Sequence, residues 1–167
     1  MLSNKLIGHL NQQINLEFYS SNLYLQMSAW ATYQGLNGCA AFLRDHAGEE
    51  MDHMQRLFTY INETGAQAIL GAIEAPPIEY TSIKEVFEQI YQHERHVTQE
   101  INSLVNNAFS EKDYSTFNFL QWYVAEQHEE ERLFKSILDK MEIIGTQGHG
   151  LFHFDQQMGQ LATSRKS

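Results

Sequence analysis

Residues 43–64 read LRDHAGEEMDHMQRLFTYINET, and a stripe with alternating spacings of three and four runs through them from Leu43 to Thr64. Such spacing is typical of the buried face of an amphipathic helix. Glu50 and His53 occupy positions of this stripe where core leucines are expected. An ionised carboxylate is costly to remove from water unless it is paired or binds a metal. The stretch therefore predicts a helix whose buried face carries polar side chains with a functional role.

Three further stretches repeat the pattern, at residues 6–31, 83–108 and 120–141. Each places one carboxylate in its apolar stripe, namely Glu17, Glu94 and Glu130. No Lys or Arg falls in any of the four stripes. Four buried carboxylates without basic partners indicate a bound multivalent cation.

A constant offset relates the two halves of the chain. The differences 94 − 17, 127 − 50 and 130 − 53 all equal 77, so Glu17 corresponds to Glu94, Glu50 to Gln127 and His53 to Glu130. The halves share little other sequence. We interpret them as two helical hairpins that bring oxygen and nitrogen ligands to the same depth, as expected of a two-metal site.

Composition restricts the function classes. The 167 residues suit one domain with a sizeable core, and a formal charge of −10 argues against binding to nucleic acid. No apolar run reaches the roughly 20 residues of a membrane span, and the N-terminus has no signal pattern, so we expect no membrane association. The single Cys39, expected as a small buried residue, favours a reducing compartment, here the cytoplasm.

Turn and cap signals predict helices over residues 3–33, 40–64, 82–109 and 114–144, and a short helix over 152–161. Residues 66–81, with both prolines, read as extended chain that reaches roughly 50 Å. This length exceeds the roughly 40 Å of the preceding helix, so the second and third helices can run parallel. We therefore expect an all-α, ferritin-like four-helix bundle with one long crossover over residues 1–145, and a C-terminal helix and tail over 146–167.

The ligand types indicate the metal. Glu50-x-x-His53 alone is a weak signal, but Glu17, Glu94 and Glu130 at matching depths make it specific. The second such motif is replaced by Gln127-x-x-Glu130. Ligands rich in oxygen and poor in nitrogen suit iron or manganese better than structural zinc.

Three stretches closely resemble bacterial non-haem ferritins, and the resemblance covers nearly the whole chain with its spacing preserved: residues 15–30 (NLEFYSSNLYLQMSAW), 46–57 (HAGEEMDHMQRL) and 117–134 (FNFLQWYVAEQHEEERLF). The resemblance implies a shell of 24 identical subunits that stores iron, with a ferroxidase centre inside each bundle that uses dioxygen or peroxide. It implies Glu17, Glu50 and His53 as ligands of the first iron, and Glu50, Glu94 and Glu130 as ligands of the second, with Glu50 as the bridge. Gln127 is expected close by, as a hydrogen-bonding group or weak ligand.

The resemblance also implies a third iron site that faces the cavity, formed by Glu49, Glu126, Glu129 and Glu130. A charge run is usually a solvated helix face, and we keep that interpretation for His128 and Glu131. Tyr24 and Trp122 fit either core packing or contact with the centre, and the resemblance favours a redox or supporting role for Tyr24. His46 is expected to be packed among apolar residues rather than to bind metal.

Three alternatives remain open at this point. A haem-containing bacterioferritin would build the same shell; Met51 resembles its haem ligand, but Gln127-x-x-Glu130 departs from the Glu-x-x-His expected there, so we expect no haem. A di-iron oxidase or peroxidase would use the same ligands on another substrate and needs a substrate pocket. A metal-free helical interaction module would leave the buried carboxylates unexplained.

Overall fold

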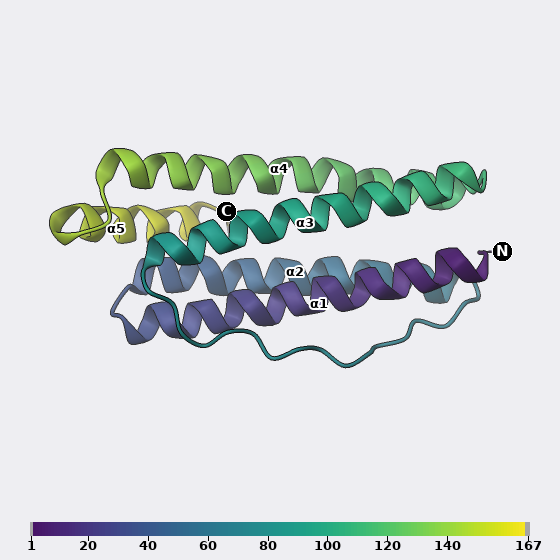
Figure 1. Ribbon diagram of the computed structural model, residues 1–167, viewed down its shortest axis with the longest axis horizontal. Helices are drawn as coiled ribbons and strands as arrows, with labels where there is room; N and C mark the ends of the chain where they lie inside the picture. The colour runs from purple at the N-terminus through teal and green to yellow at the C-terminus, as the bar shows by residue number, and fades with distance from the viewer. Residues whose placement is uncertain (1, 166–167) are drawn as a thin grey trace.

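The computed structural model describes residues 2–165, and over this range it contains five helices and no strand. The helices are α1 (Asn4–Tyr33), α2 (Asn37–Glu63), α3 (Ile83–Ser110), α4 (Tyr114–Ile144) and α5 (Gly148–Arg165). Four long helices lie nearly parallel to one axis, and α5 packs at one end (Figure 1). The predicted all-α bundle is confirmed.

The crossover between α2 and α3 decides the topology. Residues 64–82 run along the length of the bundle beside α1, so that α2 and α3 point the same way (Figure 1). The short links between α1 and α2, and between α3 and α4, make antiparallel hairpins. The arrangement matches the one predicted from the lengths of the links.

Side-chain caps begin three of the long helices as the sequence suggests. Ser3 accepts a hydrogen bond from the backbone of Leu6, Ser82 from that of Glu85, and Asp113 from that of Thr116. The carboxylate of Glu85 reaches back to the backbone N–H of Thr81 at 2.6 Å. These contacts satisfy backbone donors that have no partner within the helix.

Helix α2 begins three residues earlier than predicted, and the expected start at residue 40 was wrong. Its N-cap Leu36 makes no side-chain cap bond. Instead Asp155 of α5 accepts hydrogen bonds from the backbone of Gly38 at 3.2 Å and of Cys39 at 2.8 Å. A carboxylate from a distant part of the chain therefore caps α2, which local turn signals cannot show.

Helix α5 is longer than the predicted 152–161 and packs mainly against α2. The contact requires glycine, because a Cβ atom on Gly38 would lie 1.8 Å from the carbonyl oxygen of Asp155 and 2.9 Å from the backbone nitrogen of Gly159. Phe154, Met158 and Ala162 are buried in the same core as Cys39 and Phe42. The division of the chain at residue 145 remains a prediction.

The interior consists of two apolar cores with a polar layer between them. One core contains residues from Leu23 to Ala31 of α1 and Phe154 of α5, and the other contains residues from Leu6 to Ile14 of α1. Every long helix passes from one core to the other. The buried polar side chains in the intervening layer include Glu17, His46, Glu50, His53, Glu94, Gln127 and Glu130.

The crossover is fastened to α1 by two asparagines. The backbone N–H groups of Ile69 and Gly71 each donate at 2.8 Å, to the side-chain oxygens of Asn11 and Asn15. This chain covers the apolar side chains of the crossover only in part. Ile69, Leu70 and Ile78 are more than half exposed.

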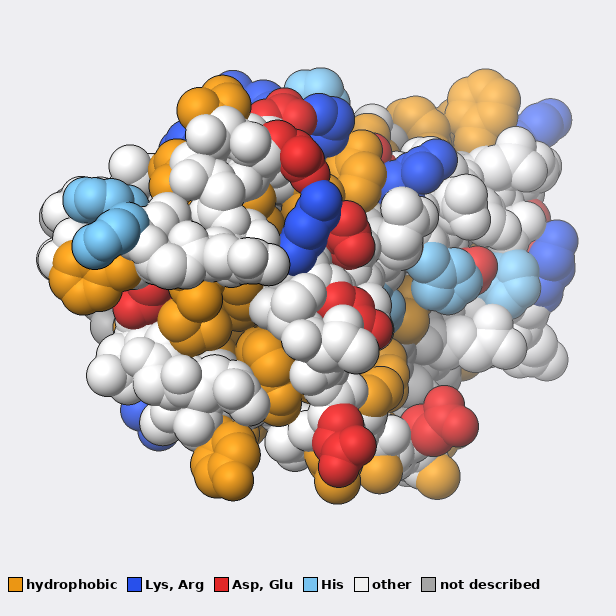
Figure 2. Space-filling view, turned by 60° about the vertical axis from the view of Figure 1, so that its left-hand side comes forward, with side chains coloured by type: hydrophobic (Ala, Val, Ile, Leu, Met, Phe, Trp, Pro, Cys, Tyr) orange, Lys and Arg blue, Asp and Glu red, His pale blue; other side chains and the backbone are white. Residues whose placement is uncertain are grey.

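The surface carries charges of both signs. On the face seen in Figure 2, acidic and basic side chains are interspersed with apolar ones, and no continuous basic field is seen there. Within residues 2–165, none of the helices is both long enough and apolar enough to cross a membrane.

Candidate metal centre

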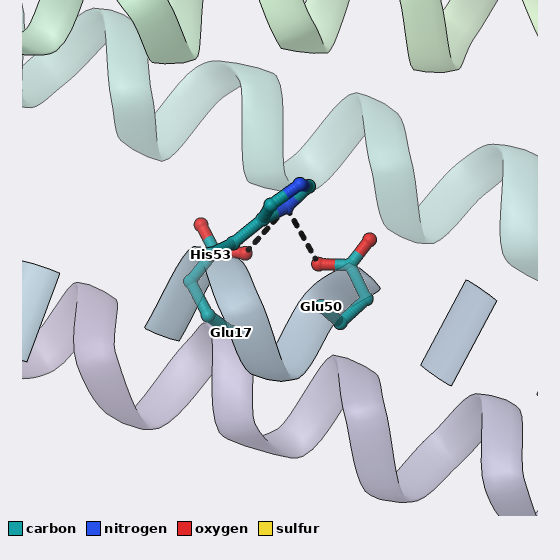
Figure 3. Close-up of side chains that lie close together, drawn as sticks. All are labelled: Glu17, Glu50 and His53. Atoms are coloured by element: carbon teal, nitrogen blue, oxygen red, sulfur yellow. Dashed lines mark ion pairs between the residues drawn. The ribbon is translucent and has the colours of Figure 1, made fainter. Parts of the chain in front are cut away.

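The first ligand group joins α1 and α2 at the centre of the polar layer. Glu17, Glu50 and His53 offer ligand atoms that all lie within 4.8 Å of one another, and all three residues are buried. Nδ1 of His53 lies 3.3 Å from Oε2 of Glu50 and 3.9 Å from Oε2 of Glu17 (Figure 3). The helical spacing of three places Glu50 and His53 on one face, and Glu17 points toward them from α1 (Figure 3).

A second group shares Glu50. His46, Glu50 and Glu130 also offer ligand atoms within 4.8 Å of one another, and all are buried. Nε2 of His46 lies 2.7 Å from Oε2 of Glu130. The histidine packs against aromatic rings as predicted, with Phe42 stacked at 5.4 Å between ring centroids, but the expectation of a purely apolar environment was wrong. The α4 carboxylate that His46 contacts is far away in the sequence.

Glu94 of α3 completes the polar layer. Its Oε1 accepts a hydrogen bond from the hydroxyl of Tyr24, and its Oε2 accepts one from Nε2 of Gln127 at 3.0 Å. Gln127 also contacts Thr98 at 3.3 Å. The hydroxyl of Tyr24 therefore reaches one of the predicted ligands, while its ring lies fully buried near His46 and Phe134.

Burial opposes ionisation of the clustered carboxylates. It raises the pKa of Glu50 well above the ordinary value, and the nearby charges of Glu94, Glu17 and Glu130 raise it further. Burial also raises the pKa of Glu17, against the lowering effect of His53. The pKa of Glu94 is raised to about 7 by burial and by Glu130, while bonds from Tyr24 and Gln127 act in the opposite sense. A multivalent cation would favour the ionised forms.

Two carboxylate oxygens also indicate a bound cation. Oε2 of Glu17 and Oε1 of Glu50 are buried and have no hydrogen-bond partner among the described residues. Buried acceptors without partners are costly in a folded protein. The donor set of carboxylate oxygens with the imidazole nitrogen of His53 fits a pair of hard or borderline divalent cations such as Fe(II).

Of the four residues expected to form a third site, Glu130 is buried in this centre. The other three lie beside it and are more exposed. The side chains of Glu49, Glu126 and Glu129 are 33%, 29% and 62% exposed, against 3% for Glu50. Oε1 of Glu126 lies 3.7 Å from Nε2 of His53, and Oε2 of Glu129 lies 3.1 Å from Arg132. Glu126, Glu129 and Glu130 line one pocket of about 660 Å³. His128 is exposed as predicted, and Glu131 is half-buried.

Trp122 contacts the centre through His53. The two rings meet edge to face with centroids 5.3 Å apart. The guanidinium carbon of Arg56 lies 4.4 Å from the centroid of the Trp122 ring, on the side of the site that opens between α2 and α4. Sequence reasoning did not single out Arg56. Its position three residues after His53, on the same helix face, is the signal that could have found it.

Comparison with known proteins gives the same assignment from independent information. Residues 7–144 match the family model described as the ferritin-like domain. The chain belongs to the ferritin family. It is 61% identical over 163 residues to a "Probable bacterial non-heme ferritin-like protein" of Haemophilus influenzae. The matched region covers 98% of this chain and 99% of the relative.

Other ferritins show how closely sequence and fold agree. The bacterial non-heme ferritin of Escherichia coli O6:H1 is 53% identical, with 98% of this chain and 99% of the relative covered. An open pore ferritin from Archaeoglobus fulgidus superposes with a TM-score of 0.92 at 41% identity, covering 95% and 96% of the two chains. Chlorobium tepidum ferritin superposes with a TM-score of 0.86 at 54% identity, covering 94% of this chain and 96% of the other. The predicted resemblance to bacterial non-haem ferritins is confirmed.

Proposed function

We propose that this ferritin oxidises Fe(II) with dioxygen at the buried centre of each bundle and stores the ferric product. The observation that carries the proposal is the pair of buried ligand groups that share Glu50. One residue can then bridge two metal ions, as a two-metal reaction requires. The names of the non-heme ferritin relatives and the shared fold support iron as the metal.

The first Fe(II) is held by Glu17, Glu50 and His53, and the second by Glu50, Glu94 and Glu130. His46 contacts Glu130 and orients this ligand. Each of the two Fe(II) ions would give one electron to dioxygen, which would take up two protons and leave as hydrogen peroxide. The carboxylates supply negative charge that stabilises Fe(III) over Fe(II), and the redox chemistry belongs to the metal. Gln127 and Tyr24 hold Glu94 through its two oxygens and thereby orient it.

An Fe(II) titration tests this function. Anaerobic addition should bind two or three Fe(II) per subunit, and exposure to air should give a fast rise in ferric absorbance. Glu50→Ala and His53→Ala should abolish the fast rise and leave the helical circular dichroism intact. Glu63→Ala, an exposed carboxylate on the same helix, is the matched control. Fast oxidation in both centre variants would remove the proposed site.

Storage requires an enclosed volume, and we propose a closed shell of 24 identical cytoplasmic subunits. The exposed Ile69, Leu70 and Ile78 of the crossover and Phe152 of α5 are apolar surface that self-association would cover. The iron-free shell would have a mass of about 24 × 19.4 ≈ 466 kDa. Light scattering distinguishes it from a dimer or a 12-subunit particle.

The haem-containing alternative depends on Met51. Its side chain is partly buried and packs against the apolar core that contains Leu57. Methionine at such a position is usually packing material. The names of the relatives, which specify non-heme ferritins, support a haem-free shell. A Soret band in protein purified from haem-replete cells would favour the alternative.

A further inference from the structure

A pocket between α1 and α3 lies next to the metal centre and takes no part in the ligand set. Its volume is about 230 Å³, and its polar lining includes groups from both helices: His9, Gln12, Gln13, His96, Glu100 and Ser103. Imidazole and carboxylate groups are common ligands of divalent first-row metal ions. The mouth is exposed at Gln12, His96, Glu100 and Ser103.

Gln13 joins this pocket to the centre. Its side chain is only 3% exposed and lines the pocket, and its Nε2 donates to Oε1 of Glu17 at 2.7 Å. The other oxygen of Glu17 faces His53 at 3.9 Å. A single amide therefore separates the pocket from the first ligand group. Rotation of that amide would open Oε1 of Glu17 to an ion in the pocket.

The centre also has an opening on the opposite side. A pocket of about 480 Å³ between α2 and α4 is lined by His53, Glu49 and Glu126, among others. Because α1 packs against α2 and α3, and α3 packs against α4, the α1/α3 seam and the α2/α4 seam lie on opposite sides of the bundle. Nε2 of His53 lies 3.7 Å from Glu126 at this second opening. A line of contacts thus crosses the bundle from Gln13 through Glu17 and His53 to Glu126.

We propose that Fe(II) reaches Glu17 through the α1/α3 pocket, with Gln13 as the gate. The α2/α4 opening then serves the oxidised product, so that substrate and product use opposite seams. This inference rests on the proposed ferroxidase function and adds the path by which its substrate arrives. His9, His96 and Glu100 are positioned to receive the hydrated ion before Gln13 passes it to Glu17.

The test blocks the pocket without touching a ligand. Ser103→Trp on α3 and Gln12→Trp on α1 each place an indole at the mouth from a different wall. Asn102→Trp, an exposed neighbour outside the lining, is the matched control. Stopped-flow absorbance is recorded with iron at two per subunit in two mixing orders. Fe(II) is added last to aerobic protein, or oxygen is added last to protein loaded anaerobically with Fe(II).

Both blocked variants should slow the iron-last reaction by about tenfold or more, since a closed route imposes an opening step before binding. The oxygen-last reaction should keep the wild-type rate, because the iron is already in place. Asn102→Trp should match wild type in both orders. An unchanged iron-last rate in either properly folded blocked variant would overturn the route. Failure of the proposed function itself looks different, because wild type would then be slow in both orders.

Discussion

Nε2 of His46 lies 2.7 Å from Oε2 of Glu130, and this contact between α2 and α4 is buried on both sides. The imidazole also meets the ring of Phe134 edge to face, with the two ring centroids 5.0 Å apart. His46 therefore holds one of the predicted ligands in place before any metal binds. The contact predicts a stability effect that depends on the metal.

His46→Leu should destabilise the metal-free protein by about 1–3 kcal/mol, because the substitution removes the hydrogen bond to a buried carboxylate. The loss should shrink when Zn²⁺ is bound, since the metal then holds Glu130. Thermal unfolding with a chelator and with Zn²⁺ measures both values. His128→Leu, an exposed histidine on α4, should change little. An equal loss in both conditions would show that His46 acts only by packing.

Glu49, Glu126 and Glu129 should tune turnover without being needed for the first pair of irons. Their side chains are partly exposed beside the buried groups rather than within them. Single Ala substitutions should lower anaerobic Fe(II) binding by one ion per subunit and change the ratio of oxygen consumed to iron oxidised. Glu131→Ala removes the same charge nearby and is the control. Complete loss of oxidation would contradict the assignment.

The metal-free protein should lose stability as the pH rises from about 4.5 to above 7. The pKa of Glu94 in the folded state, about 7, lies above its unfolded value of 4.5. The folded state therefore binds more protons than the unfolded state in this window, and the free energy of unfolding falls with pH. Below the window the carboxyl is protonated in both states.

Glu94→Gln should flatten this part of the profile, because the amide stays neutral throughout. Unfolding midpoints measured with a chelator between pH 4 and 8 give the comparison. Subtracting the variant from wild type removes the contribution of histidines elsewhere. A difference that does not depend on pH would refute the stated cause.

Asp155→Ala should weaken the docking of α5 and cost about 0.5–2 kcal/mol, the usual effect of losing an N-cap. It should also expose Cys39. Burial and the neighbouring Asp155 raise the pKa of the Cys39 thiol, so native wild-type protein should react slowly with a thiol reagent. The variant should react faster at the same pH, while Asp155→Asn, which retains one acceptor oxygen, should fall between them. Equal labelling rates would mean that the cap does not hold α5 on Cys39.

The sequence is sufficient to predict the bundle because the buried residues of each long helix recur at spacings of three and four. Glu17, Glu50, Glu94 and Glu130 are conspicuous for the same reason, since they interrupt apolar stripes. The length of residues 66–81 against that of a helix predicts the crossover. These are properties of single elements, or of distances along the chain.

Contacts between distant elements are harder to predict. The cap that Asp155 supplies to α2 joins residues 116 positions apart, and local signals placed the start of the helix too late. The contact between His46 and Glu130 spans 84 positions. On its own stripe, His46 is a histidine one turn before Glu50 and carries no sign of the partner. Gln13 was missed because an amide at a helical position is unremarkable until its neighbour is known to be Glu17.

Glu50 belongs to both ligand groups, and this sharing constrains any redesign of the centre. A change at that one position alters both metal positions together, so the two cannot be tuned separately through it. In the proposed centre, the residues that serve only one iron offer independent control: Glu17 and His53 for the first, and Glu94 and Glu130 for the second. An engineer who wants unlike ions side by side in this bundle must therefore leave Glu50 untouched and vary its neighbours.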